Sequence, residues 1–125
     1  GCPGQVNYDA MPAVVYTHPE LASVGLSEEA AAAAGRELAI GKYQFRANAR
    51  AHCMDEIDGL VKIVADVETD ELLGMHILGS QASHLIAEGV LALEFGASAE
   101  DVARTVHAHP ALSEVVKEAA WAVSE

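Results

Sequence analysis

The chain has 125 residues, of which 51% are hydrophobic, and this is enough for a single domain with a buried core. Nineteen acidic against seven basic residues give a net charge of −12, which argues against binding to nucleic acid or to an anionic membrane surface, because both require clustered basic side chains. No apolar stretch is long enough for a membrane span, and the N-terminus lacks the pattern of a secretion signal, so we expect an intracellular protein.

The first part of the chain is predicted to enter a domain and then form a hairpin. Residues 1–11 are rich in Gly, Pro and Asn and show no apolar period, which is typical of a linker, so the domain is expected at 12–125. Short β-branched runs at 13–17 and 22–26 flank a turn signal at Pro19. These two runs predict two short strands.

The middle third of the chain is predicted to be extended. Alternating and β-branched residues predict strands at 37–45, 60–66 and 72–79. Residues 48–59 are expected to be an irregular excursion that ends in an Asp-Gly turn, and 67–71 a hairpin loop. Short connections of this kind predict antiparallel pairing.

Helices are predicted before and after these strands. A capping serine, two glutamates and a closing glycine predict a short helix at 27–35. An apolar helix is expected to end at Gly96, Ser98 and Asp101 resemble a capping box, and a last helix is expected at 113–123. The predicted class is therefore α+β, an antiparallel β-sheet with helices packed on one face.

Several binding motifs are absent from the sequence. No G-x-G-x-x-G follows a strand and no P-loop lysine occurs, so we expect this chain to hold no nucleotide cofactor by itself. Cys2 and Cys53 are far apart and lack metal-ligand spacing, which predicts no disulfide framework and a free thiol at Cys53. A nucleophile made of Cys53 and His52 is disfavoured, because adjacent residues rarely present both side chains to one point.

The stretch "VHAHPALSEVVKEAAW" holds the candidate chemistry. His107 and His109 form an H-x-H pair, but no third ligand is evident, so we predict no metal site. If Pro110 begins a tight turn, Glu114 in the first turn of the next helix can return to His109. A carboxylate that accepts the ring N–H fixes the tautomer and favours the protonated imidazole, as in an acid/base pair. A purely structural ion pair is the alternative.

From about Tyr8 to Val123 the chain resembles the C-terminal interface domain of the pyridine nucleotide-disulfide oxidoreductases. The resemblance is carried, in order and with matching spacing, by "VVYTHPELASVGLSEEAA", "ANARA" and the long stretch from "GLVKIVADV" to "VHAHPALSEVVKEAA". Within this family the sequence is most similar to the dihydrolipoamide dehydrogenases, with the glutathione reductases as the alternative. Two positions depart from the common pattern: Ala111 replaces a threonine and His84 a glutamate.

The resemblance implies roles for the His-Pro segment. It implies that His109 is the acid/base catalyst toward a redox-active thiol in the oxidation of dihydrolipoamide, and that Glu114 holds and polarises it. It also implies a homodimer in which each chain completes its partner's active site. A cis peptide at Pro110, with the backbone of His109 and Pro110 near the partner's flavin, belongs to the same pattern. His107 is then expected to be nearly silent in turnover.

The resemblance also implies parts that this sequence lacks. FAD- and NAD-binding domains and a redox pair spaced C-x-x-x-x-C are expected before Gly1, so the chain alone is predicted to be inactive. The expected partner is the lipoamide-bearing subunit of a 2-oxoacid dehydrogenase or glycine cleavage complex. The expected location is the bacterial cytoplasm or the mitochondrial matrix. A non-catalytic dimerisation module is the alternative reading.

Overall fold

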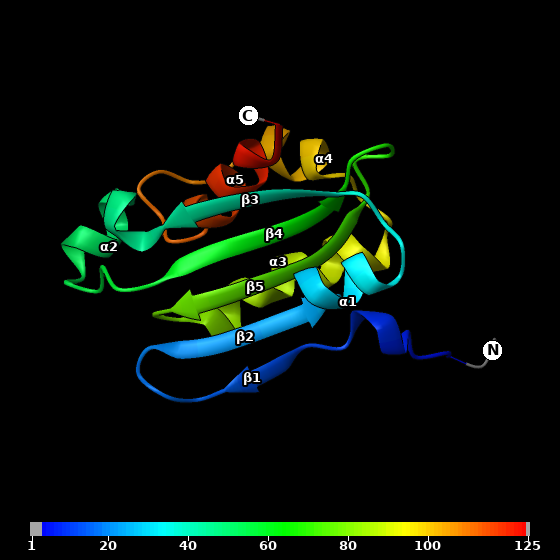
Figure 1. Cartoon of the computed structure of the whole chain (residues 1–125). Helices are drawn as coiled ribbons and strands as arrows, with labels where there is room; N and C mark the ends of the chain where they lie inside the picture. Colours follow the sequence, from blue (N-terminus) through cyan, green and yellow to red (C-terminus); the bar gives the residue numbers. More distant parts are fainter. Residues whose placement is uncertain (1–3, 125) are drawn as a thin grey trace.

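One five-stranded antiparallel sheet forms the centre of the computed structural model, which describes residues 4–124 (Figure 1). The strand order is β1-β2-β5-β4-β3, so the mostly buried strand β5 is central, and all neighbours pair antiparallel. The predicted antiparallel α+β class is thus confirmed. The strands are β1 (Ala13–Val15), β2 (Glu20–Gly25), β3 (Leu38–Gln44), β4 (Leu60–Asp66) and β5 (Leu72–Gly79).

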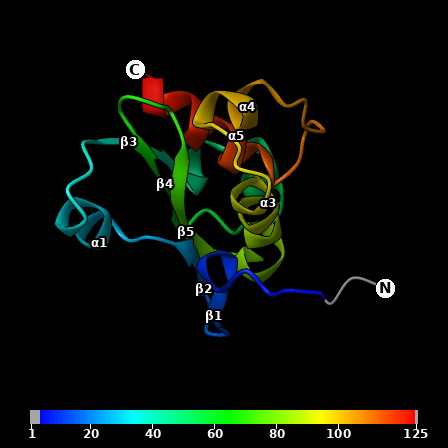
Figure 2. The ribbon, with the colours of Figure 1, turned by 90° about the vertical axis from the view of Figure 1, so that its right-hand side faces the viewer.

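Helices cover the two faces of this sheet unequally. Seen along its edge, the sheet has α3, α4 and α5 on one side and α1 on the other (Figure 2). The prediction of helices on one face therefore holds for the C-terminal helices, but α1 lies on the opposite face. There the buried Ala31 of α1 packs against Val64 and Leu73 in a small separate cluster. The helices are α1 (Glu28–Ala33), α2 (Ala49–Cys53), α3 (Ala82–Glu94), α4 (Ala99–Arg104) and α5 (Glu114–Trp121).

The larger hydrophobic core lies between the sheet and the C-terminal helices. Its largest fully buried side chains come from β2, β4, β5, α5 and the segment after β3. Burial of one such aliphatic side chain contributes about 1.5–3 kcal/mol, so α5 is fixed firmly against the sheet. These large, fully buried residues are Phe45, Ile63, Met75, Ile77, Val24, Val61, Val115 and Val116.

The segment after β3 is more regular than the sequence predicted. Where an irregular excursion was expected, the chain forms a 3-10 turn, η2 (Phe45–Ala47), and then α2. Asn48 begins α2, and its Oδ1 accepts the N–H of Ala51 at 2.9 Å. Five helical residues are too few to show an apolar period, so the capping asparagine was the only available sequence signal.

The two predicted helix caps are confirmed. Ser27 Oγ accepts the N–H of Ala30 at 3.1 Å at the start of α1. Ser98 and Asp101 form a reciprocal capping box at the start of α4, with both bonds 3.0 Å long. Both caps use contacts three residues apart, which a sequence pattern can show directly.

Part of the predicted linker packs against the domain. Asn7 Nδ2 donates to a carboxylate oxygen of Glu94 on α3 at 3.0 Å, and Ala10 is buried. Residues 1–3 of the linker, with Cys2, lie outside the described residues, and the boundary before residue 12 stays a prediction. Cys53 is an exposed free thiol, as predicted. Among the helices of residues 4–124, none has the length and apolar character to cross a membrane.

Replacement of Gly41 tests the packing of α5 on β3. A Cβ at this position would lie 2.0 Å from the carbonyl oxygen of Ala119 and 2.7 Å from Cγ2 of Val123. We expect Gly41→Ala to lower the free energy of unfolding by about 1–3 kcal/mol or more, because the helix must move away from the strand. Chemical denaturation of the chain measures this. Gly4→Ala is the matched control, since no atom lies within 4 Å of its added Cβ; equal stability of the two variants would contradict the packing.

Candidate functional site

The loop between α4 and α5 carries the predicted site. It connects Arg104 to Glu114, and its His109–Pro110 peptide bond is cis, in agreement with the sequence-based expectation. The side chain of His109 is 72% exposed, whereas that of Glu114 is 23% exposed. The loop thus presents an imidazole at the surface, while most of its carboxylate partner is covered.

The structure brings Glu114 back to His109, as the sequence predicted. Nδ1 of His109 lies 3.1 Å from Oε1 and 3.0 Å from Oε2 of Glu114. Since a carboxylate only accepts hydrogen bonds, Nδ1 carries the proton in this contact. Among residues 4–124, Nε2 has no hydrogen-bond partner. The ring nitrogen that is left free for another group is therefore Nε2.

Glu114 is held in its charged form by its surroundings. The N–H of Ala111, which donates to Oε1 at 2.9 Å, contributes most to lowering the pKa of Glu114 below its usual value. The hydrogen bond and charge of His109 and the charge of Lys117 lower this pKa further, while partial burial opposes them. Glu114 is also the first residue of α5, where a negative charge is favoured by the helix dipole. At neutral pH it is a carboxylate.

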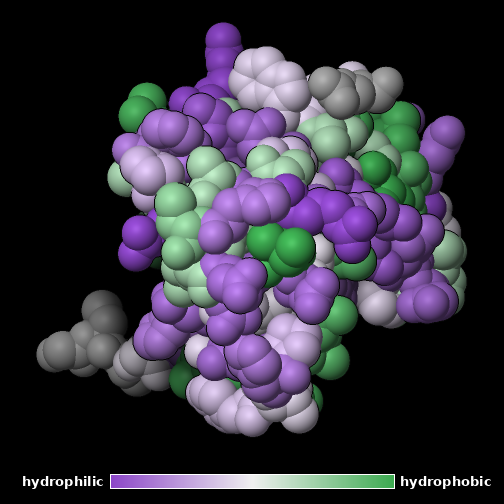
Figure 3. Space-filling model, turned by 90° about the vertical axis from the view of Figure 1, so that its left-hand side faces the viewer, coloured by the Kyte–Doolittle hydropathy of each residue, from purple (hydrophilic) through white to green (hydrophobic). Residues whose placement is uncertain are grey.

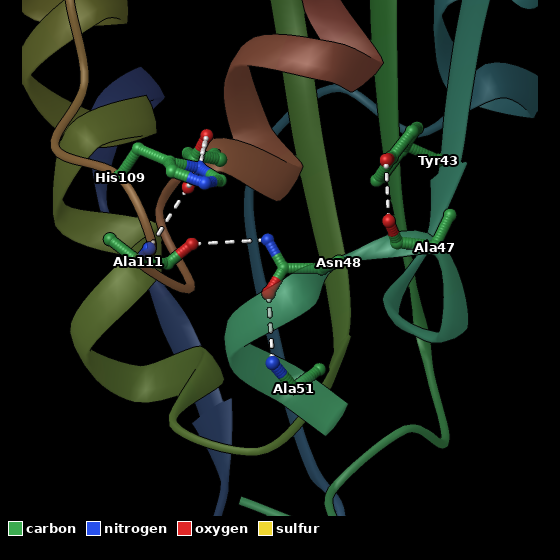
Figure 4. A network of polar contacts seen from close by, with 7 residues as sticks. Tyr43, Ala47, Asn48, Ala51, His109 and Ala111 are labelled. Carbon is green, nitrogen blue, oxygen red and sulfur yellow. Dashed lines mark hydrogen bonds and ion pairs between the residues drawn. The ribbon is translucent and has the colours of Figure 1, made fainter. Parts of the chain in front are cut away.

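A third residue, Asn48, contacts the same loop from a distant part of the chain. Its Nδ2 donates to the carbonyl oxygen of Ala111 at 3.0 Å (Figure 4). Sequence reasoning did not assign Asn48 to the site, although "ANARA" was noted as a family-like segment. No local pattern pairs residues that are 63 positions apart.

His107 and His109 have different hydrogen-bond partners. Its ring is only 7% exposed and lies between two acceptors, the carbonyl of Thr105 at 2.8 Å from Nδ1 and Oε1 of Glu88 at 2.6 Å from Nε2. His109 instead contacts Glu114. Within residues 4–124 no cluster of three His, Cys, Asp or Glu side chains is arranged to hold a metal ion.

The side chain of His109 lies on the surface of the domain. Hydrophilic side chains surround smaller groups of hydrophobic ones on the face on the α2 side (Figure 3). A hollow of about 480 Å³ lies between α4 and the C-terminal end of α5, but His109 is not among its lining residues. A substrate bound at His109 would need further protein surface to enclose it. The hollow is lined by Asp70, Ala99, Glu100, Ala103, Arg104, Ala120, Trp121, Val123 and Ser124.

Comparison with known proteins identifies the family of this domain. The family model of the pyridine nucleotide-disulphide oxidoreductase dimerisation domain matches residues 11–120. The chain belongs to this family. The resemblance seen in the sequence is thereby confirmed, and so is the fold that it implied.

Individual relatives agree with this assignment. The mitochondrial dihydrolipoyl dehydrogenase of Schizosaccharomyces pombe is 56% identical over 119 residues, which cover 95% of this chain and 23% of the relative. The dihydrolipoyl dehydrogenase of Trypanosoma brucei brucei is 54% identical, covering 98% and 26%. The crystal structure of LpdA from Mycobacterium tuberculosis superposes with a TM-score of 0.87 at 28% identity, over 94% of this chain and 26% of that one. The chain thus spans about a quarter of the length of the proteins it matches.

The burial of His107 changes what its substitution is expected to do. Its ring is hydrogen-bonded to Thr105 and Glu88, so the expectation of a nearly silent effect on turnover stays a prediction, but these two bonds predict a loss of stability. We expect His107→Gln to lower the free energy of unfolding by about 1–3 kcal/mol, because a planar ring that joins two acceptors is lost. Chemical denaturation measures this against His84→Gln, a control at an exposed position of α3. Equal stability of both variants would contradict the assigned contacts.

Proposed function

We propose that this domain supplies the acid/base pair of a dihydrolipoyl dehydrogenase, with His109 as the proton acceptor and Glu114 as its charged partner. The observation that carries the proposal is the contact of His109 Nδ1 with both Glu114 oxygens, which directs the free Nε2 outward. Identities of 56% and 54% to dihydrolipoyl dehydrogenases over nearly the whole chain support this substrate class over that of the glutathione reductases.

The chemistry follows from the protonation of the ring. A dithiol substrate must lose a proton before it attacks a disulfide, because the thiolate is the nucleophile. Nε2 of His109 accepts this proton, and the imidazolium that forms is stabilised by the adjacent carboxylate of Glu114. The N–H of Ala111 keeps that carboxylate ionised and oriented. The pair thus promotes thiolate formation in one direction and protonates the thiolate in the other.

FAD and NAD are assigned to parts of the complete enzyme outside this chain. Among residues 4–124 no glycine-rich turn of the dinucleotide-binding kind follows a strand, which supports this assignment. When bound, these cofactors supply the electron and hydride transfer. We propose only that the backbone of His109 and Pro110 lies near the flavin of a partner subunit.

In this proposal, a second copy of the chain supplies the protein surface that encloses a substrate at His109. The matched family is one of dimerisation domains. In an isologous two-fold contact, each chain can place its His109 in the active site of the other. We therefore propose a homodimer with two shared sites, acting on a lipoamide-bearing subunit of a 2-oxoacid dehydrogenase or glycine cleavage complex. The name of the Schizosaccharomyces pombe relative supports a mitochondrial location over a bacterial cytoplasmic one.

Substitution of the pair tests the catalytic proposal against that of a non-catalytic dimerisation module. In the complete enzyme, His109→Gln should retain the dimer and FAD but lower dihydrolipoamide turnover by on the order of 10²-fold or more, the scale for loss of a positioned acid/base. Glu114→Gln should cause a smaller loss, because the base remains and only its orientation and charge partner are removed. Steady-state kinetics measure both, with His84→Gln as control. Full turnover by His109→Gln would leave only the dimerisation role.

The isolated chain offers a separate test of the proposal that other parts of the enzyme bind the cofactors. We expect the purified 125 residues to show no dihydrolipoamide oxidation and no flavin absorbance, because the redox chemistry belongs to cofactors that this domain does not hold. Visible absorption spectroscopy and an NAD-linked assay measure this. Stoichiometric FAD in the purified chain would overturn the assignment of cofactor binding to other parts of the enzyme.

A further inference from the structure

The side chain of Asn48 makes two hydrogen bonds of different kinds. Its Oδ1 accepts the N–H of Ala51 and so caps α2, while its Nδ2 donates to the carbonyl oxygen of Ala111 in the His109 loop (Figure 4). Asn48 is only 4% exposed, so water does not readily replace these contacts. One buried amide therefore joins α2 to the loop.

Capping of α2 does not by itself require an asparagine. Serine and aspartate supply an equally good acceptor at this position, but neither a short hydroxyl nor a carboxylate reproduces the donor that reaches Ala111. The amide also has one favourable orientation, because rotation by half a turn would place Nδ2 against the N–H of Ala51 and Oδ1 against the carbonyl of Ala111. The donor half of Asn48 thus serves the loop and not the helix.

The donor is carried by a rigid part of the fold. The N–H of Asn48 donates to the carbonyl of Phe45 at 2.8 Å, and the ring of Phe45 is fully buried in the core. The hydroxyl of Tyr43 on β3 donates to the carbonyl of Ala47 at 3.0 Å, which ties the preceding turn to the sheet (Figure 4). The position of the Asn48 amide is therefore set by the sheet and its core.

The recipient, Ala111, is held from two directions. Its carbonyl accepts from Asn48, and its N–H donates to the Glu114 oxygen that also contacts His109. A shift of Ala111 would move the donor on which the Glu114 carboxylate depends. The bonds form one continuous connection from the sheet to the imidazole.

We propose that Asn48 is a positioning residue for the His109–Glu114 pair, acting through the carbonyl of Ala111. The proposal rests on the function proposed above, since it assigns Asn48 to the same site. In the described part of the chain, the Asn48 side chain is hydrogen-bonded to Ala51 and Ala111 and not to His109 or Glu114. Its effect on turnover is exerted through the geometry of the loop.

Two substitutions in the complete enzyme separate positioning from capping. Asn48→Ser keeps a capping oxygen but is too short to reach Ala111, and Asn48→Asp is nearly isosteric but places an acceptor against the carbonyl. We expect both to retain FAD and the dimer but to lower the thermal midpoint moderately, because each leaves the carbonyl of Ala111 without its buried donor. Their kcat should fall about tenfold or more, because misplacement of a catalytic group by about 1 Å costs up to 10²-fold. KM for dihydrolipoamide should change by less than about twofold.

Two reference variants make each outcome decisive. Ser27→Ala removes the cap of α1 on the opposite face of the sheet and should lower the thermal midpoint without changing kcat. If the Asn48 variants keep full kcat while His109→Gln is impaired, Asn48 is not a positioning residue but the proposed function stands. Full activity of His109→Gln would overturn both proposals. Loss of the folded dimer in both Asn48 variants would also count against positioning, since the role then cannot be separated from folding.

Discussion

The carboxylate of Glu114 is the contact on which the arrangement of the site depends. One oxygen receives the N–H of Ala111, and both oxygens lie within hydrogen-bond distance of Nδ1 of His109. A carboxylate shared in this way fixes the conformation of the loop and the tautomer of the imidazole at the same time. Its lowered pKa, caused first by the backbone of Ala111, keeps the charge present at the pH where the pair would work.

The position of this carboxylate follows from the packing of one helix. Glu114 begins α5, whose residues Val115 and Val116 are fully buried against the sheet. On the other side of this contact β3 has a glycine, Gly41, at a point where a Cβ would lie 2.0 Å from the carbonyl oxygen of Ala119 in the helix. The hydrophobic core thus determines where the first turn of α5 lies, and the first turn determines where Glu114 points. The geometry of the site therefore depends on the packing of the core.

The domain combines precise local geometry with an open surface. His109 is mostly exposed, and the described hollow between α4 and α5 does not include it. Such a site is suited to completion by another surface, because an exposed ring on a rigid loop can enter a partner without rearrangement. This agrees with membership in a dimerisation-domain family. In the proposed function the domain contributes a preorganised base, and the substrate cavity is formed by assembly.

The sequence by itself determined the elements and contacts that are local along the chain. Alternating apolar runs predicted the strands, and capping residues three positions apart predicted the helix starts at Ser27 and Ser98. The contact of His109 with Glu114, five positions apart across a proline turn, was predictable for the same reason. Such patterns carry information because the interacting groups are brought together by backbone geometry alone.

Only the tertiary structure decided the contacts between distant segments. The amide of Asn48 meets Ala111 across 63 positions, and His107 meets Glu88 across 19, and neither pairing leaves a periodic signal. The placement of α1 on the opposite face of the sheet was likewise invisible, because a short alanine-rich helix has no strong apolar face to orient it. These contacts depend on which parts of the sheet and core stay accessible to other segments. This is decided only when the whole chain packs.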